Sequence, residues 1–109
     1  MDRELHERIG ANEAVFREVN EGISRGRYPG EDDDPRGFRC ECARLGCNKM
    51  VELTARDYER IRASSRHFLV APGHEMPELE QVVERHDGYV IVEKTGPAAV
   101  RADASDPRG

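Results

Sequence analysis

The chain has 109 residues, of which 36% are charged and 37% apolar, with 6% aromatic residues and no Trp. This composition is typical of one small soluble domain with a modest core. The longest apolar runs, at 68–71 and 89–92, are far shorter than the ~18 residues of a membrane span, and residues 1–5 lack the apolar segment of a secretory signal. We therefore expect a cytoplasmic protein, in which three cysteines indicate metal or redox chemistry rather than disulfides.

The net charge of −5 conceals a basic middle third. Residues 1–34 carry 5 basic and 10 acidic side chains, residues 35–68 carry 8 and 4, and residues 69–109 carry 4 and 8. The three thirds therefore have net charges of −5, +4 and −4. A basic segment within an acidic chain is a candidate binding surface for an acidic partner.

An amphipathic helix is expected over residues 1–24, because apolar side chains recur there at spacings of three and four. The seam consists of Leu5, Ile9, Phe16, Val19 and Ile23, with Asn12 as its one polar position. A narrow seam is typical of helices that pair in coiled coils. It can pack on the chain's own core or serve a homodimer or a partner protein. We expect the partner-docking or dimerising role, because the acidic, Gly- and Pro-rich stretch 25–37 is typical of a flexible linker.

Residues 38–95 are expected to form a compact domain of short elements. The segments 38–42 and 49–53 are predicted to pair as a β-hairpin. Thr54 is predicted to cap a helix that runs to about residue 65, with a capping box and a hydrophobic staple at its start. A short strand is predicted over 67–71.

The C-terminal third is expected to contain a second helix, a strand and a tail. A helix is predicted over 77–86, with Pro77 in its first turn and Gly88 after its end. A central strand is predicted over 89–94, and residues 96–109 are expected to be a flexible tail. The fold class is therefore α+β: a small zinc-stapled domain with a β-hairpin, two short helices and two further strands, preceded by the N-terminal helix.

Three cysteines fall within eight residues as C-x-C-x4-C. Because side chains two apart on a strand share a face, we expect Cys40 and Cys42 to converge while Arg39 and Glu41 point away, and the hairpin turn to return Cys47. Three thiolates suit zinc, which structural sites hold with four ligands. The alternative is three ordinary buried or free cysteines.

A fourth ligand is required, and His74 is the best candidate because it follows Pro72-Gly73 in a tight loop. His67, at a strand start, and His86, on a predicted helix, are alternatives, as are a carboxylate, a water or a second chain. Three Cys and one His fill every position of a tetrahedral zinc, which favours a structural over a catalytic site. The spacing does not match iron–sulfur proteins of the plant type, and no catalytic triad order, P-loop or dinucleotide motif occurs.

Several motifs along the chain resemble those of a known protein family. They are Phe-Arg-x-x-Asn-Glu-x-Ile at 16–23, Phe-x-Cys-x-Cys at 38–42 with a third cysteine at 47, Leu-Thr-x-x-(Asp/Glu)-Tyr-Glu at 53–59, Pro-Gly-His-Glu at 72–75 and Val-Val-Glu-Arg at 82–85. In these motifs the chain resembles a family of small proteins of unassigned function from GC-rich bacteria. The resemblance spans almost the whole chain, implies a small metal-binding protein and supports His74 as a ligand.

The expected function is a non-catalytic, zinc-finger-like adaptor or regulatory module that contacts a protein partner or a second copy through its N-terminal helix. One alternative is a nucleic-acid-associated regulator that uses the basic middle third, although the net charge and the lack of stacking aromatics argue against it. The arginines concerned are Arg39, Arg44, Arg56, Arg60, Arg62 and Arg66. A thiol redox sensor is a third possibility. Neither a membrane nor a small-molecule substrate is expected.

Overall fold

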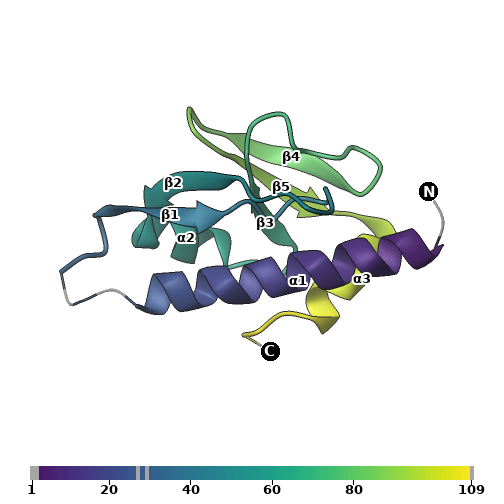
Figure 1. Ribbon diagram of the computed structural model, residues 1–109, viewed down its shortest axis with the longest axis horizontal. Helices are drawn as coiled ribbons and strands as arrows, with labels where there is room; N and C mark the ends of the chain where they lie inside the picture. The colour runs from purple at the N-terminus through teal and green to yellow at the C-terminus, as the bar shows by residue number, and fades with distance from the viewer. Residues whose placement is uncertain (1–2, 27, 29, 109) are drawn as a thin grey trace.

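The computed structural model describes residues 3–26, 28 and 30–108. Its elements are α1 (Arg3–Arg25), β1 (Pro35–Arg39), β2 (Met50–Thr54), α2 (Ala55–Ile61), β3 (His67–Val70), β4 (Glu80–Arg85), β5 (Val90–Lys94) and α3 (Gly96–Ala104) (Figure 1). The predicted α+β class is confirmed. The long helix α1 runs along one side of the molecule, with α3 beside it and the strands above (Figure 1).

The strands form two antiparallel sheets. β1 pairs with β2 so that Phe38 lies opposite Val51, and β5 lies between β3 and β4 in a three-stranded sheet. The two sheets are connected just after β1, where the Glu41 N–H donates to the Leu69 carbonyl at 2.6 Å. The cysteine loop is therefore tied directly to the edge of the larger sheet.

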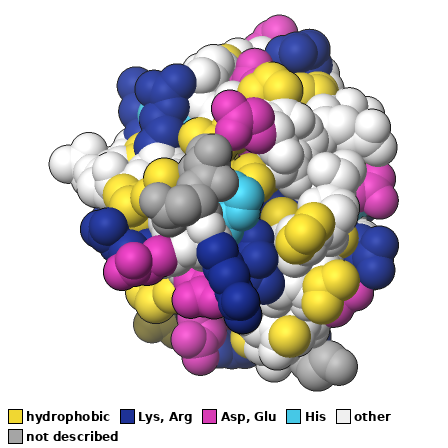
Figure 2. Space-filling view, turned by 90° about the vertical axis from the view of Figure 1, so that its right-hand side faces the viewer, with side chains coloured by type: hydrophobic (Ala, Val, Ile, Leu, Met, Phe, Trp, Pro, Cys, Tyr) yellow, Lys and Arg dark blue, Asp and Glu magenta, His cyan; other side chains and the backbone are white. Residues whose placement is uncertain are grey.

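The surface at one end of the molecule is mixed in character. At the end of the molecule where α1 begins, basic and acidic groups alternate with small hydrophobic areas (Figure 2). Within the described residues, no helix combines the length and the apolar character that a membrane crossing requires.

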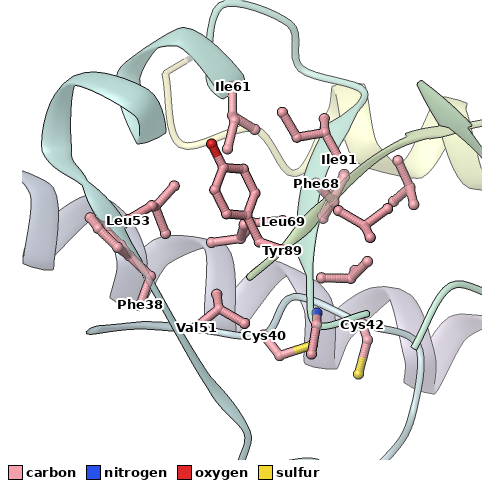
Figure 3. Close-up of a cluster of buried hydrophobic side chains, with 14 of the residues drawn as sticks. Phe38, Cys40, Cys42, Val51, Leu53, Ile61, Phe68, Leu69, Tyr89 and Ile91 are labelled. Carbon is pink, nitrogen blue, oxygen red and sulfur yellow. The ribbon is translucent and has the colours of Figure 1, made fainter. Parts of the chain in front are cut away.

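The hydrophobic core lies between α2, the hairpin and the three-stranded sheet. Phe38 and Tyr58 stack with ring centroids 4.7 Å apart, and β5 contributes three consecutive buried residues, as expected of a central strand. Cys40 and Cys42 lie at one edge of this cluster (Figure 3). The core therefore reaches the backbone of the predicted metal loop.

The predicted cap of the first short helix is confirmed. The Thr54 hydroxyl accepts a hydrogen bond from the Asp57 N–H at 3.1 Å, and α2 begins at the next residue, Ala55. Such a cap satisfies one of the unpaired amides at a helix start. It also sets the direction in which α2 leaves β2 and carries Tyr58 into the core.

The structure places α1 against its own chain with a face that differs from the apolar seam. The buried residues of α1 are Ile9, Glu13, Arg17, Asn20, Glu21 and Ser24. Of the seam, Ile9 is buried, Leu5, Phe16 and Ile23 are half-buried, and Val19 is exposed. Helical periodicity predicted the helix correctly, but the polar side chains with long-range partners determine which face is buried.

The described part of the stretch 25–37 is tied to its neighbours. Arg36 donates to the Ile23 carbonyl at 3.1 Å and pairs with Glu31 at 3.2 Å. The Arg56 N–H donates to the Asp32 carbonyl at 3.0 Å. The chain between α1 and the hairpin thus contacts both α1 and α2, and its last residues, from Pro35, belong to β1.

Two expectations in the C-terminal third are wrong. The segment predicted as a helix over 77–86 instead forms β4, because Val82 pairs with Val92 of β5 and a bulge accommodates Val83. The apolar spacing there satisfies both periods, and strand pairing decides between them. The expected flexible tail contains α3, whose buried alanines Ala98, Ala99 and Ala102 let it approach α1 and β5 closely.

Candidate metal centre

The side chains of Cys40, Cys42, Cys47 and His74 converge. Their ligand atoms all lie within 4.8 Å of one another. His74 Nδ1 is 3.7 Å from the sulfur of Cys40 and 3.7 Å from that of Cys47. In a tetrahedron with zinc–sulfur and zinc–nitrogen bonds of about 2.3 and 2.0 Å, sulfur and nitrogen are about 3.5 Å apart. The donor set and its spacing therefore fit a tetrahedral metal ion.

Cys40 and Cys42 follow β1, which ends at Arg39, and so lie outside the strand that was predicted to extend to residue 42. The predicted alternation is still present, with Glu41 directed into the core. The Glu41 carboxylate accepts hydrogen bonds from the Leu69 N–H at 2.9 Å, the Tyr58 hydroxyl at 2.6 Å and the Asn20 amide at 2.8 Å. These donors come from β3, α2 and α1. Burial raises the pKa of Glu41, and the hydrogen bonds act in the opposite direction. Fixing Glu41 on one side of the segment directs the two cysteines to the other.

Two tight turns bring in the remaining ligands. The Cys47 N–H donates to the Arg44 carbonyl at 3.2 Å, and Gly46 between them has φ +82°. The His74 N–H donates to the Ala71 carbonyl at 3.0 Å, again with a glycine, Gly73, at φ +85°. Positive φ favours glycine, which lacks a Cβ. The Ala71 N–H also donates to Cys40 Sγ at 3.1 Å, which connects the two loops.

The Cys40 and Cys42 thiols shift each other's pKa in opposite directions. A hydrogen bond from Cys40 lowers the pKa of Cys42, with further help from His74, the Arg44 N–H and Cys47 and against the effect of burial. The same hydrogen bond, together with burial, raises the pKa of Cys40. Metal binding requires thiolates, and a cation between the sulfurs offsets the repulsion that opposes ionisation of Cys40 and Cys42 together.

The other histidines considered as ligands lie elsewhere. His67 is on β3, 3.9 Å from the Glu93 carboxylate. His86 lies 2.9 Å from Glu84 and stacks on Tyr89. The fourth member of the group is therefore His74, on the loop where the sequence predicted it.

The six arginines of the alternative interface do not form one free basic surface. Four of them face carboxylates of the chain, and Arg62 is fully buried. The ion pairs are Arg56 with Asp33 at 2.6 Å, Arg60 with Asp57 and Glu84 at 3.9 Å each, Arg62 with Glu21 and Asp106, and Arg66 with Asp103 at 2.9 Å. Among the described residues, the other two arginines have no carboxylate contact of this kind. Arg39 lies over the Phe16 ring at 4.6 Å, and Arg44 donates to the Gly73 carbonyl at 2.8 Å. Much of the positive charge in the middle third is therefore neutralised within the fold.

A buried charged cluster, which the sequence did not indicate, lies under α1. The Lys94 ammonium donates to Glu13 of α1 and, at 2.5 Å, to Glu80 of β4. Burial raises the pKa of Glu13 to about 7, against the attraction of Lys94. Lys94 and Arg17 both lie over the Phe68 ring, at 4.9 and 4.5 Å. The four-residue spacing of Ile9, Glu13 and Arg17 is the only local signal, and charged residues at such a spacing are usually solvent-exposed.

Similarity to known proteins does not add to this description. No family model, curated protein or solved structure matches the chain. What the site can do therefore follows from its donor set: three sulfurs and one imidazole nitrogen in a cluster that could hold a metal ion.

Proposed function

We propose that the protein is a non-catalytic zinc-binding adaptor or regulatory module with a structural Cys3His site. The observation that carries this proposal is the convergence of Cys40, Cys42, Cys47 and His74 to within 4.8 Å. Zinc is the ion that tetrahedral thiolate–imidazole sites most commonly hold, and four protein ligands leave no open position for a substrate or an activated water.

The position of the site in the fold supports a structural role. It connects the loop after β1 to the loop after β3, and the second of these leads into β4. Structural zinc contributes on the order of 10 kcal/mol or more in small peptides, which is comparable to the whole stability of a small domain.

In this proposal α1 still binds the partner, but through the side that faces away from the rest of the chain. Most of the predicted seam is covered by the chain itself, whereas Val15 and Val19, one turn apart, are 55% and 44% exposed. Paired valines on the outside of a long helix fit a small helix–helix contact, and we propose a second copy of this chain as the occupant. A Val15→Glu, Val19→Glu double variant is expected to remain folded and zinc-loaded and to be monomeric by light scattering under conditions where the wild type dimerises.

Metal analysis of the purified chain tests the central claim. We expect one zinc per chain after dialysis without added metal. His74→Ala should lower zinc affinity by at least a hundredfold in a chelator competition, whereas His67→Ala, whose ring lies beside Glu93, should leave affinity unchanged. A folded, metal-free chain with three titratable thiols would contradict the proposal.

A further inference from the structure

We propose that Cys47 is the oxidation-sensitive ligand of this centre, and that its reaction with a peroxide releases the metal and loosens the packing of α1. The inference rests on the proposed zinc site and assigns it a regulatory chemistry. Three differences between Cys47 and the other two cysteines carry it: access, hydrogen bonding at sulfur and the charge nearby.

The three cysteines differ first in their access to solvent. Cys40 and Cys42 are each 1% exposed and lie at the edge of the hydrophobic core (Figure 3). Cys47 is half-buried at the end of the turn, next to exposed residues on both sides. A small oxidant in solvent therefore reaches Cys47 before it reaches the others.

Hydrogen bonding at sulfur also differs. The Ala71 N–H donates to Cys40 at 3.1 Å, and the Arg44 N–H donates to Cys42. Among the hydrogen bonds of the described residues, none joins a backbone N–H to the Cys47 sulfur, which contacts the side chains of His74 and Cys42. Donors around a metal thiolate withdraw electron density from sulfur and tune its reactivity. Cys47 consequently keeps the most nucleophilic lone pairs of the three.

Positive charge lies close to Cys47. The Arg39 guanidinium donates to the Cys47 carbonyl at 3.3 Å, and that of Arg44 spans the site to the Gly73 carbonyl at 2.8 Å. Cysteines in partly exposed, electropositive surroundings are the ones that react as thiolates. Both arginines therefore favour reaction at Cys47, and Arg44 also joins the loop that carries the cysteines to the loop that carries His74.

The chemistry requires hydrogen peroxide as the oxidant and proceeds in two steps. The Cys47 thiolate attacks one peroxide oxygen: an S–O bond forms, the O–O bond breaks, and the departing hydroxide takes up a proton to become water. The Cys42 thiolate then attacks the sulfur of this sulfenic acid: an S–S bond forms, the S–O bond breaks, and a second hydroxide becomes water. Overall, two thiolates are oxidised by two electrons, and one peroxide and two protons give two waters. Two ligands are then lost from the ion.

The effect of metal release on α1 follows from the residues that pack on the loop carrying Cys40, Cys42 and Cys47. Ala43, between Cys42 and Cys47, belongs to a small apolar cluster with Ile9 of α1 and Leu79, and Leu5 and Met76 pack against it. The C-terminal half of α1 contacts the same loop, because Asn20 donates to the Arg39 carbonyl and to Glu41 at 2.8 Å each. Release of the metal therefore removes support from both halves of α1.

The test uses the full-length, zinc-loaded protein, with its zinc content measured first. Hydrogen peroxide is added in the presence of a chromogenic zinc chelator, and peptide mass spectrometry follows each cysteine with sulfenic-acid trapping and differential alkylation. We expect Cys47 to be oxidised at least tenfold faster than Cys40, one zinc to be released per Cys47 oxidised, and a Cys42–Cys47 disulfide to accumulate. Zinc present at the start with Cys40 or Cys42 oxidised first, or all three at equal rates, would overturn the inference. Absence of zinc at the start would instead contradict the proposed function.

A matched pair of variants isolates Cys47. Cys47→His keeps four ligands and should release zinc at least tenfold more slowly than the wild type, whereas Cys42→His keeps Cys47 and should form the Cys47 sulfenic acid at close to the wild-type rate. If neither variant binds zinc, the residue-by-residue oxidation of the wild type still decides the question. Hydrogen exchange measures the effect on α1: amides of residues 9–13 and of residues 20–24 should lose protection on oxidation. Unchanged protection of both segments would overturn the proposed loosening of α1.

Discussion

Two interfaces on the same small domain are built from opposite chemistry. The hairpin and α2 pack on the sheet through apolar side chains such as Phe38, Leu53 and Tyr58. The interface under α1 buries Glu13, Arg17, Asn20, Glu21 and Ser24 instead. Apolar burial is favourable in almost any register, whereas each buried polar group must meet its own partner or lose about 1 to 3 kcal/mol. Specific polar contacts therefore hold α1 in place more than apolar burial does. The predictions below test this difference between the two interfaces.

The largest effect on stability is expected from the loss of a metal ligand. Cys47→Ser removes one thiolate and, with it, most of the metal's contribution to stability, which is on the order of 10 kcal/mol in small zinc peptides. We expect a poorly folded chain that no longer retains zinc, measured by circular dichroism and metal analysis. An unchanged melting temperature would mean that Cys47 belongs to the core and not to a metal site.

A smaller but still large effect is expected from Lys94→Met. The variant leaves Glu13 and Glu80 buried beside each other without their cation, and breaking a buried ion pair in this way costs about 3 to 5 kcal/mol. Urea unfolding measures the loss. Lys49→Met, at an exposed lysine, is the control and should change stability by no more than about 0.5 kcal/mol. Equal effects of the two substitutions would show that the buried cluster does not hold α1.

Two asparagines on α1 should respond in opposite ways. Asn20 donates to the Arg39 carbonyl at 2.8 Å and to Glu41, and accepts from the Arg39 N–H at 2.7 Å. Asn20→Ala should therefore cost about 2 to 3 kcal/mol, because it leaves buried partners unsatisfied. The Asn12 amide nitrogen is buried without a partner among the described residues, so Asn12→Leu should be neutral or stabilising in thermal unfolding. A large loss at Asn12 would show that the seam matters more than the polar face.

The smallest predicted effect is a pH dependence that belongs to Glu13. Its pKa is raised from 4.5 to about 7 when the protein folds, so the folded state holds a proton that the unfolded chain releases. The resulting stability is fully present below about pH 4.5 and is lost as the pH rises through 7. Between pH 6 and 8, where zinc thiolates persist, the wild type should lose about 1 kcal/mol relative to Glu13→Gln. Glu18→Gln, an exposed change on the same helix, should show no such difference.

The elements predicted correctly are those whose causes are local. Thr54 and Asp57 lie three residues apart and form the cap of α2 by themselves. The short spacing of Cys40, Cys42 and Cys47 likewise requires only an extended segment and a turn to bring the sulfurs together. In both cases the interacting groups are close in sequence, so few chain conformations compete. His74 is 27 residues from Cys47 and was identifiable by its Pro-Gly loop.

The elements predicted wrongly depend on partners distant in sequence. Val82 and Val83 suit a helix or a strand, and β5 selects the strand by pairing with it. The alanines of α3 carry no strong signal of their own, and they become helical core because α1 and β5 offer a surface that small side chains fit.

The sequence by itself determined that residues 3–25 form a helix and that three cysteines and a histidine can share one site, because periodicity and turn chemistry act over a few residues. Only the tertiary structure decided which face of that helix is buried and how the basic middle third is used. Glu13 requires Lys94, 81 residues away, and Arg62 requires Glu21 and Asp106. Such charges are buried only when the fold supplies their partners, and no local pattern records where those partners will lie.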